Sequence, residues 1–340
     1  MSDGEGIFLT TIKDIAKKAG FSIATVSRVL NNDDNLSVTD STREKIFQVA
    51  NQLGYRKKSV QPIIKNIAFL YWLTDKEELE DVYFKTMREE VEKYAKLLNV
   101  ELTTYKISKG IEQIPKDIEG FIAIGGFSKD ELNYLSKITL NGVFIDSTPN
   151  PNYFDSVRPD LATITMNAID YFIAKGHSQI GFIGGTYHDP DTDMEKMDLR
   201  ERKFREYMRE KDLLNEQFIY CNPGFSVNNG YQLMNKAIDQ LGEDLPTAFL
   251  VAADPIAIGC LQALNEQQIV IPNRVSVIGI NNVNVTKYVS PPLTTFHIDI
   301  PELSKNAVEL LIDRITTNRK YVKTVCISAK LIERKSVNKI

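Results

Sequence analysis

Cysteine is scarce in this sequence, and its three copies stand far apart. Cys221, Cys260 and Cys326 form no CxxC pair and share no Cys/His ligand spacing. Scattered cysteines are typical of reduced thiols inside a cell rather than of a disulfide framework or a structural zinc site. We therefore expect a cytoplasmic protein without a bound metal.

Long apolar runs are also missing. No run approaches the roughly 18 residues that a membrane-spanning helix needs, and the opening MSDGEGIFL is acidic, with too short an apolar part for a signal peptide. The contents of 43% hydrophobic and 25% charged residues are ordinary for a globular chain. The composition predicts a protein that does not act at a membrane.

Motifs of the common enzyme classes are absent as well. The three histidines, His177, His188 and His297, lie in no HExxH or triad-like setting, and no GxSxG occurs. The run GFIGGT is only a weak glycine-rich signal, because neither GxGxxG nor GxxxxGK[ST] is present. We expect neither an enzyme nor a bound cofactor.

A pair of short amphipathic helices is present near the start. The first has one apolar face, formed by Ile12, Ile15, Ala16 and Ala19. Gly20 ends this helix, and Ser22 is a suitable N-cap for the next one. That second helix, predicted over residues 23–31, turns three apolar residues inward, Val26, Val29 and Leu30.

The spacing within this pair is typical of a helix-turn-helix rather than of a structural helical hairpin. Ala16 supplies a small residue where the helices cross, Gly20 a turn with positive φ, and Val26 a plug between the helices. Arg28 points away from that core, as a base-reading residue does. Residues 10–65 hold ten Lys/Arg against five Asp/Glu, a net charge of +5 in a chain whose total is −4. A local basic segment suits the phosphate backbone of DNA.

A third helix completes the predicted head. Thr39 is a plausible N-cap, Gly54 stands where a left-handed C-cap belongs, and the buried stripe is Ile46, Val49, Ala50 and Leu53. The basic run RKKSVQPIIK follows as a linker in which Pro62 discourages helix.

Short β-rich runs alternate with amphipathic helices from Asn66 onward. This alternation predicts parallel, doubly wound α/β sheets. Ligands bind outside the carboxyl ends of such strands. The loops after Trp72, Phe127, Thr186, Asp254 and Asn281 are therefore the first places to look for a binding site.

The whole chain resembles the LacI/GalR family of bacterial transcription regulators. The residues that carry the resemblance are TIKDIAKKAGFSIATVSRVLN, LGY (53–55), KGHSQIGFIGG (175–185), ADPIAIGCLQAL (253–264), VSVIGINN (275–282), PPLTTFHID (291–299) and LIERKSV (331–337). The resemblance implies a core of two subdomains like those of periplasmic sugar-binding proteins, with a small effector between them. It also implies a homodimer, since the chain ends soon after LIERKSV, where the coiled coil of tetrameric members would follow.

The resemblance divides the chain into three parts. It predicts a helix-turn-helix domain at 1–56, a short linker at 57–65 and an effector-binding and dimerisation core at 66–340. The chain is expected to cross between subdomains near Asp160, Pro291 and Arg319. One subdomain then spans about 66–160 and 291–319, and the other about 161–290 and 320–340.

The resemblance also assigns the DNA contacts. Ile23 or Ala24 would pack on a thymine methyl group, and Arg28 would offer a bidentate fork to guanine. The positions that match phosphate contacts are Ser22, Thr25, Ser27 and Asn31. The linker departs from the family, because Tyr55 and Ile67 are only twelve positions apart and no wedge leucine lies between them. A head that reads the major groove without a minor-groove wedge is expected, with the basic residues 56–58 either on phosphates or in an exposed tether.

Six positions match the effector contacts of the family: Tyr83, Phe84, Asp160, Arg200, Phe225 and Asn281. Arg200 with Phe225 suits a sugar, because a guanidinium holds hydroxyls and an aromatic ring stacks on a pyranose. Tyr83 and Phe84 could instead be core, and Arg200 could pair with Glu201 or Glu195. Asn281 replaces a common aspartate, and Asp254 is expected to cap the helix that begins at Pro255.

These features predict a sequence-specific repressor of a sugar-utilisation operon that a small sugar, galactose or a galactoside, releases from its operator. The segment at 71–84 and the short linker look most like galactose-operon repressors of Gram-positive bacteria. Two alternatives remain open. One is a corepressed regulator that binds a phosphocarrier protein or a nucleobase, and the other is a cytoplasmic sugar-acting enzyme.

Overall fold

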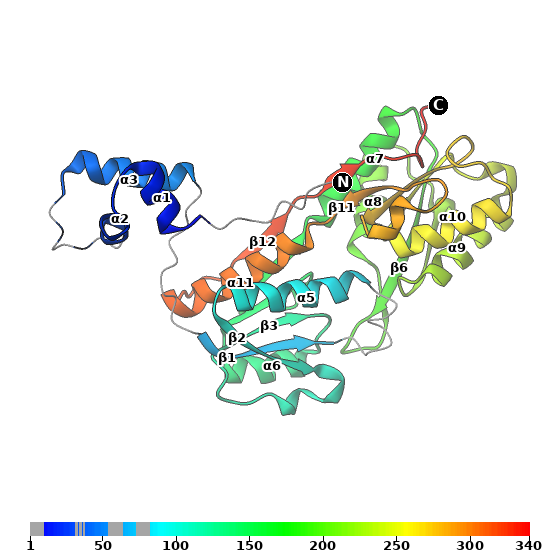
Figure 1. Ribbon diagram of the computed structural model, residues 1–340. Coiled ribbons are helices and arrows are strands. Elements are labelled where there is room, and N and C mark those ends of the chain that lie inside the picture. Colours follow the sequence, from blue (N-terminus) through cyan, green and yellow to red (C-terminus); the bar gives the residue numbers. More distant parts are fainter. Residues whose placement is uncertain (1–9, 31–32, 34–35, 37, 54–63, 73–81) are drawn as a thin grey trace. The chain divides into compact units, whose positions relative to one another are not determined.

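The computed structural model describes residues 10–30, 33, 36, 38–53, 64–72 and 82–340. The chain divides into two compact units, Met1–Pro62 and Ile63–Ile340. Figure 1 shows that the first is helical and the second is built from α/β layers. Over the described residues, no helix combines the length and the apolar character needed to cross a membrane.

The first unit contains the helices that the sequence predicted. They are α1 (Ile12–Ala19), α2 (Ile23–Leu30) and α3 (Asp40–Gln52). Their apolar faces meet in one cluster, in which Ile15, Val26, Val29 and Ile46 have no exposed surface. The predicted helix cap at Gly54 and the linker as far as residue 63 lie outside the described residues.

A six-stranded parallel sheet forms the first subdomain of the second unit. Its strands are β1 (Ile64–Tyr71), β2 (Val100–Lys106), β3 (Gly120–Ile124), β4 (Gly142–Ile145), β5 (Asp155–Pro159) and β12 (Thr324–Ile327), in the order β12-β5-β4-β3-β1-β2. The helices α5 (Val82–Leu97) and α11 (Ile300–Thr317) cover one face and α6 (Lys129–Ile138) the other. Since strand side chains alternate, Phe69 and Tyr71 pack with α5 and α11, whereas Leu70 packs with α6.

A second, mostly parallel sheet forms the other subdomain. Its strands are β6 (Ile180–His188), β7 (Glu195–Lys196), β8 (Ile219–Pro223), β9 (Ala248–Val251), β10 (Ser276–Asn281), β11 (Thr294–His297) and β13 (Lys330–Ile332). The order is β13-β11-β10-β9-β6-β7, with β8 paired to β6 and with β7 and β13 antiparallel.

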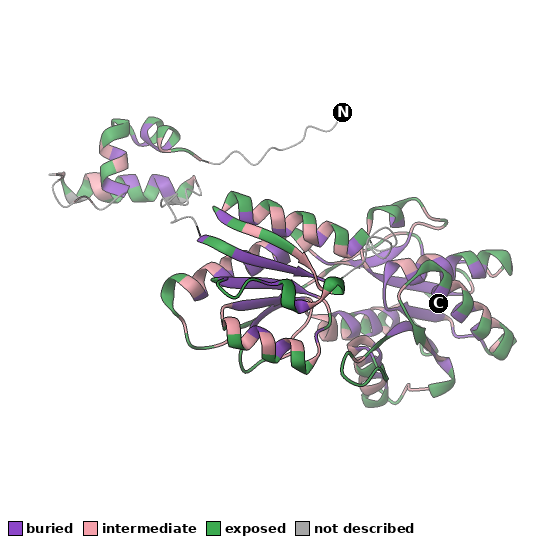
Figure 2. Ribbon diagram, turned by 90° about the horizontal axis from the view of Figure 1, so that it is seen from below, coloured by how far each residue is buried: buried purple, intermediate pink, exposed green. Residues whose placement is uncertain are grey.

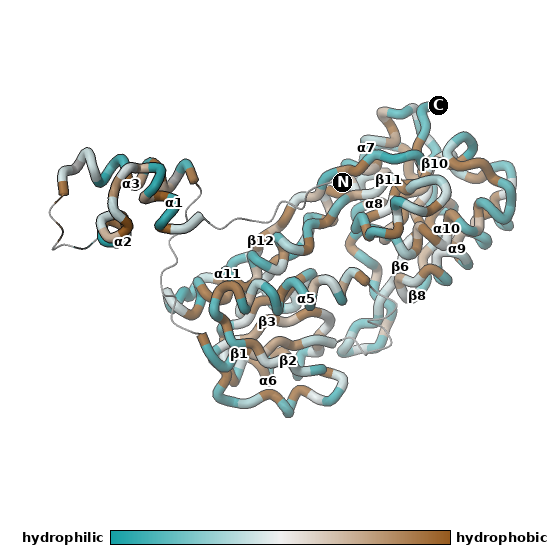
Figure 3. The backbone as a smooth tube through the Cα atoms, viewed as in Figure 1, coloured by the Kyte–Doolittle hydropathy of each residue, from teal (hydrophilic) through white to brown (hydrophobic). Residues whose placement is uncertain are grey.

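Two pairs of helices cover this second sheet. The helices α7 (Leu161–Ala174) and α8 (Leu199–Glu210) pack on one face, and α9 (Val227–Leu241) and α10 (Asp254–Glu266) pack on the other. Short 3-10 helices lie in the connections: η1 (Ile107–Lys109), η2 (Ile111–Gln113), η3 (Glu216–Phe218), η4 (Gly242–Asp244) and η5 (Asn284–Lys287). The central strands of both sheets are buried between their helices, whereas edge strands such as β2, β7 and β12 are more exposed (Figure 2), and the helices alternate apolar and polar segments (Figure 3).

Two of the three predicted crossing points between the subdomains are wrong. The first is right, since Asp160 separates β5 from α7. The second comes after β11, beyond Pro291, because β11 pairs with β10 in the second sheet. The third comes after β12, beyond Arg319, because β12 pairs with β5 in the first sheet. Which sheet a strand joins depends on its pairing with strands that are distant in sequence. Nothing within a short apolar run indicates that sheet. The first core strand also begins earlier than predicted, at Ile64.

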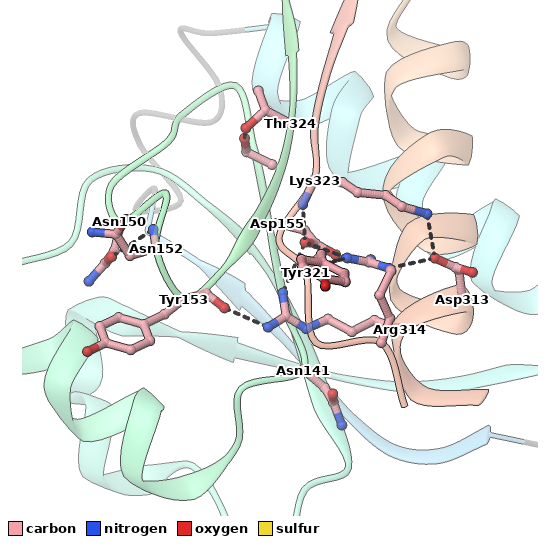
Figure 4. Close-up of polar contacts among 12 residues, drawn as sticks. Asn141, Asn150, Asn152, Tyr153, Asp155, Asp313, Arg314, Tyr321, Lys323 and Thr324 are labelled. Carbon is pink, nitrogen blue, oxygen red and sulfur yellow. Dashed lines mark hydrogen bonds and ion pairs between the residues drawn. The ribbon is translucent and has the colours of Figure 1, made fainter. Parts of the chain in front are cut away.

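A buried ion cluster fixes β12 to the first subdomain (Figure 4). The side chain of Asp155 has no exposed surface, and its Oδ1 accepts from Arg314 Nη1 at 3.0 Å and from the backbone N–H of Lys323 at 2.7 Å. Arg319 also donates to this carboxylate and to Asp313. The cluster joins α11, β5 and the start of β12, which explains why β12 lies in this sheet.

Candidate DNA-reading helix and effector site

The turn between α1 and α2 is set by local capping. Thr11 and Asp14 form a capping box at the start of α1, in which each side chain accepts from the backbone N–H of the other. Gly20 ends α1 with φ 78° in the left-handed region. The Ser22 hydroxyl then accepts from the backbone N–H of Thr25 at 3.0 Å, so the predicted N-cap is confirmed.

The outer face of α2 carries the predicted base-reading residues. Ile23 is 53% exposed, and Ala24 and Arg28 are exposed as well. Arg28 Nε donates to Asp33 Oδ2 at 2.7 Å, an ion pair that the sequence did not predict. Within the described residues the terminal nitrogens of this guanidinium have no hydrogen-bond partner, so both can serve a bidentate contact.

The predicted phosphate contacts lie on the same helix. Ser22 is exposed, and Thr25 and Ser27 are half-buried. Asn31 lies outside the described residues. Ser22 and Thr25 lie at the start of α2, where they bond each other, and Ser27 lies further along the helix on its other flank.

Arg200 is the centre of the candidate effector site. It stands in the first turn of α8, and its Nε and Nη2 donate to the two oxygens of Asp198 at 2.7 and 2.9 Å. Nη1 donates to the carbonyl of Ala252 at 2.7 Å, and the guanidinium lies 5.0 Å from the centroid of the Phe225 ring. The predicted alternative, a pair with Glu201 or Glu195, is wrong, because Glu201 binds Arg205.

The charges around Arg200 are strongly coupled. Burial alone would raise the pKa of Asp198, but the adjacent Arg200 outweighs it and holds that pKa below its usual range. Burial likewise opposes the charge of Arg200, and Asp198, Asp146 and Tyr83 together raise its pKa. Since Asp146 and Tyr83 belong to the first subdomain, groups from both subdomains converge on this guanidinium. We call Tyr83, Asp146, Asp198, Arg200 and Phe225 the Arg200 cluster.

The first-subdomain side of this cluster is aromatic. Tyr83 is only 6% exposed and packs in the core, yet its hydroxyl donates to Asp146 Oδ1 at 3.3 Å. Phe84 lies edge-on to Tyr83 and to Trp72. Trp72 is 37% exposed and packs over Gly125, where φ is 115° and a Cβ would collide with the indole.

The remaining predicted effector residues lie apart from this cluster or have other partners. Asp160 caps α7, since its oxygens accept from Thr163 N at 3.1 Å and from Thr163 Oγ1 at 2.7 Å. Asn281 ends β10 with φ 115°, and within the described part of the chain its amide has no hydrogen-bond partner. Asp254 does not cap α10 as predicted, because the N-cap is Ala253 and the Asp254 carboxyl bonds Val283 N and Thr295 Oγ1.

Sequence reasoning missed three residues of this region. Asp146 follows β4 and Asp198 precedes α8, so both stand at ends of elements where loop carboxylates gather. Trp72 is the only tryptophan of the chain and directly follows β1. A search for polar and aromatic residues just after each strand would have found Asp146 and Trp72, whereas the pairing of Asp198 with Arg200 depends on side-chain geometry.

Comparisons with known proteins agree with this arrangement. Residues 11–58 match the family described as "Bacterial regulatory proteins, lacI family", and residues 169–337 match a "Periplasmic binding protein-like domain". The HTH-type transcriptional regulator GanR of Bacillus subtilis (strain 168) is 65% identical over 330 residues, which cover 97% of this chain and 100% of that protein. The chain belongs to the LacI family of bacterial regulatory proteins.

Two solved structures share the fold of this LacI-family chain. A transcriptional regulator CelR–cellobiose complex has a TM-score of 0.69 at 20% identity, covering 96% of this chain and 99% of that one. A lac repressor dimer bound to operator and the anti-inducer ONPF has a TM-score of 0.67 at 20% identity, covering 97% and 99%. As a LacI-family member, the chain is a DNA-binding transcriptional regulator whose α1 and α2 form the helix-turn-helix.

Proposed function

We propose that this protein is a cytoplasmic repressor of a sugar-utilisation operon and that a small sugar releases it from its operator. The observation that carries the proposal is the guanidinium of Arg200, fixed by Asp198 and lying 5.0 Å from the Phe225 ring. Its terminal nitrogens each carry a second hydrogen that can hold a hydroxyl, and the ring offers a face for a pyranose. The proposed role is binding, with no catalytic step.

The proposed effector is galactose or a galactoside. It would contact residues at the carboxyl ends of strands in both sheets: Tyr83, Phe84, Asp160, Arg200, Phe225 and Asn281. Of these, Asp160 is the weakest candidate, because both of its oxygens already bond Thr163. The cellobiose in the complex that shares this fold supports a sugar of similar chemistry.

The proposed operator contacts lie on α2. Arg28 reads guanine, Ile23 and Ala24 contact thymine methyl groups, and the phosphate contacts are Ser22, Thr25, Ser27 and Asn31. We propose three functional parts: a DNA-binding head at 1–56, a linker at 57–65, and an effector-binding and dimerisation core from residue 66. A homodimer would present two heads to a palindromic site, and the exposed Val285 and Tyr288 of the core are apolar surface that a second copy could cover.

A sugar panel tests the proposal directly. Calorimetric titration would measure binding of galactose, lactose, glucose, cellobiose, galactose 6-phosphate and hypoxanthine to the full chain. A gel shift on the DNA upstream of its own gene would then measure operator affinity with and without each compound that binds. We expect a galactoside to bind and to lower operator affinity.

Matched variants separate binding from folding. Arg200→Gln should abolish sugar binding and retain operator binding, whereas Arg205→Gln, on the same helix but paired with Glu201 and Glu216, should bind the sugar like wild type. Binding of hypoxanthine or of the phosphosugar alone would contradict the sugar assignment. A compound that raises operator affinity would identify a corepressor instead.

A further inference from the structure

A buried carboxyl group supports the loop that carries Asn281. Asp254 is the first residue of α10 and has no exposed surface. Its Oδ2 accepts from the backbone N–H of Val283 at 2.9 Å, and its Oδ1 accepts from the Thr295 hydroxyl at 2.7 Å. The carboxyl therefore ties the residues after β10 to α10 and to the neighbouring strand β11.

The strand beside this carboxyl leaves room for it. Gly279 lies in β10, and a Cβ on this residue would collide with Asp254 Oδ1. Only glycine permits so close an approach of the carboxyl to the strand. The surroundings of the Asp254 carboxyl are therefore formed by α10, β10 and β11 together.

A cation also holds this loop. Arg334, just after β13, donates from Nη2 to Asn282 Oδ1 at 2.6 Å. Its Nη1 donates to the Leu293 carbonyl at 2.7 Å and to Thr286 Oγ1 at 3.1 Å. The loop is thus bonded both by the carboxyl group of Asp254 and by the guanidinium of Arg334.

The loop needs this support because its backbone is strained. Asn281 and Asn282 have φ values of 115° and 57°, in the left-handed region that favours glycine. Such conformations persist only where surrounding contacts impose them. The contacts that Asp254 and Arg334 make with residues 282 and 283 supply that constraint.

We propose that Asp254 is a positioning residue for effector binding, which holds Asn281 in its binding orientation through the backbone at 282–283 without touching the effector. The inference rests on the proposed function, since it requires that the effector contacts Asn281. The ionised carboxylate supports the loop best, because it accepts from Val283 and Thr295 at the same time. A protonated carboxyl gives up part of that accepting capacity.

This support responds to pH near neutrality. Burial raises the pKa of Asp254 to about 7, against the opposing hydrogen bonds from Thr295 and the backbone and the charge of Arg334. The charged or titratable groups that face it are Arg334 after β13 and, beyond Asn282, His297 of β11, whose Nδ1 lies 3.2 Å from Asn282 Nδ2. Effector affinity should therefore rise as pH rises through the pKa of Asp254.

The test compares wild type with Asp254→Asn, which keeps the shape of the side chain but cannot ionise. Galactose and lactose are titrated calorimetrically into the full chain between pH 6 and pH 8. For the wild type we expect affinity at pH 6 to be about threefold to tenfold weaker than at pH 8. For Asp254→Asn we expect weak affinity that no longer follows pH. A wild-type pH profile in Asp254→Asn would overturn the inference.

Further variants guard against loss of folding. Thr295→Val removes the hydrogen bond to Asp254 and the one that the Thr295 hydroxyl accepts from the backbone N–H of Asn282, but it keeps the carboxylate, so its affinity should fall while its pH dependence remains. Asp239→Asn makes the same chemical change at an exposed position of α9 and should match wild type. An Asp239→Asn protein that loses the pH dependence would contradict the assignment to Asp254.

Hydrogen exchange tests the positioning without a ligand. Exchange of the peptide that covers residues 281–286 should be faster in Asp254→Asn than in wild type and Asp239→Asn. Unchanged exchange would overturn the inference even if the sugars bind. If neither sugar binds the wild type, the effector proposal fails, while exchange still decides whether Asp254 holds the loop.

Discussion

The carboxylate of Asp191 accepts a hydrogen bond of 2.7 Å from the backbone N–H of Lys129, which is the first residue of α6. Asp191 lies on the hairpin between β6 and β7 in the second subdomain, and α6 covers the first sheet. The first N–H groups of a helix have no partner within it, and they attract anions. The bond therefore connects the two subdomains at a helix end.

A second carboxylate, that of Asp189, holds the turn at the tip of the hairpin. Asp189 Oδ1 accepts from the backbone N–H groups of Asp191 and Thr192 at 3.0 and 3.1 Å, and its Oδ2 accepts from Lys196 Nζ at 2.8 Å. The Lys196 ammonium and these N–H groups lower the pKa of Asp189 to about 2. The turn that presents Asp191 is thus held in shape across the neutral pH range.

Removing the Asp191 carboxylate should weaken effector binding. If the effector binds the arrangement in which the hairpin meets α6, Asp191→Ala destabilises that arrangement by about 0.5–2 kcal/mol, the usual value of a carboxylate at a helix N-terminus. We expect sugar affinity to fall by about twofold to 30-fold in calorimetry. Met194→Ala, at a 63% exposed side chain on the same hairpin, is the matched control. Equal sugar affinities of Asp191→Ala and Met194→Ala would show that the contact of Asp191 with α6 plays no part in effector binding.

The local features of the head could be predicted because their causes lie within a few residues. Ser22 bonds Thr25, Thr11 bonds Asp14, and Gly20 takes its positive φ at the helix end. Each signal is complete within one turn of helix. The ion pair of Arg28 with Asp33 was missed, because several side chains of this segment are possible partners for an arginine.

The core was less predictable, because the decisive partners are distant in sequence. The buried Asp155 meets Arg314 and Arg319 more than 150 positions later, and this contact draws β12 into the first sheet. The residues next to Asp254 in the sequence predict that it caps a helix, yet its carboxyl group bonds Val283 and Thr295. The sequence pattern predicted parallel α/β sheets and the family resemblance predicted two subdomains, both correctly, but neither could assign these long-range pairs.

Arg28→Ala should remove sequence discrimination at one base pair of the operator. A bidentate contact with guanine is worth about 1–3 kcal/mol, so specific affinity should fall by about fivefold to 150-fold. Weak, salt-sensitive binding to unrelated DNA should remain, since phosphate contacts supply it. Lys13→Ala removes one charge from an exposed position of α1 and should lower the affinities for operator and for unrelated DNA alike. Gel shifts on operator and scrambled duplexes measure the ratio, and an unchanged ratio in Arg28→Ala contradicts the assignment.

Asp155→Ala should strongly destabilise the core. The substitution leaves Arg314, 4% exposed, and the largely buried Arg319 without their shared anion. Breaking a buried pair in this way costs about 3–5 kcal/mol. Asp313→Ala removes a 37% exposed carboxylate from the same cluster, where the expected cost is about 1 kcal/mol or less. Urea unfolding of the two variants measures the difference, and similar costs would mean that the cluster is not held by Asp155.

His177 should make the core less stable in mild acid. The ring is 2% exposed, and its Nε2 donates to the Asn338 carbonyl, so that Nδ1 accepts from the Thr247 hydroxyl at 2.9 Å. Burial lowers the pKa of His177, and the hydrogen bond to Asn338 only partly opposes this. The unfolded chain takes up a proton below its ordinary pKa of about 6.5, while the folded ring stays neutral.

The sign of the pH effect follows from this difference. As pH falls from about 6.5 toward the lower pKa of the folded ring, the unfolded state binds more protons and the free energy of unfolding decreases by up to about 1.4 kcal/mol per pH unit. Wild type should thus lose more stability between pH 7.5 and pH 5.5 than His177→Gln. Urea unfolding at both pH values measures this difference, with His188→Gln on the exposed hairpin as the control for loss of an imidazole. Parallel losses in wild type and His177→Gln would show that the folded ring takes up its proton as readily as the unfolded chain.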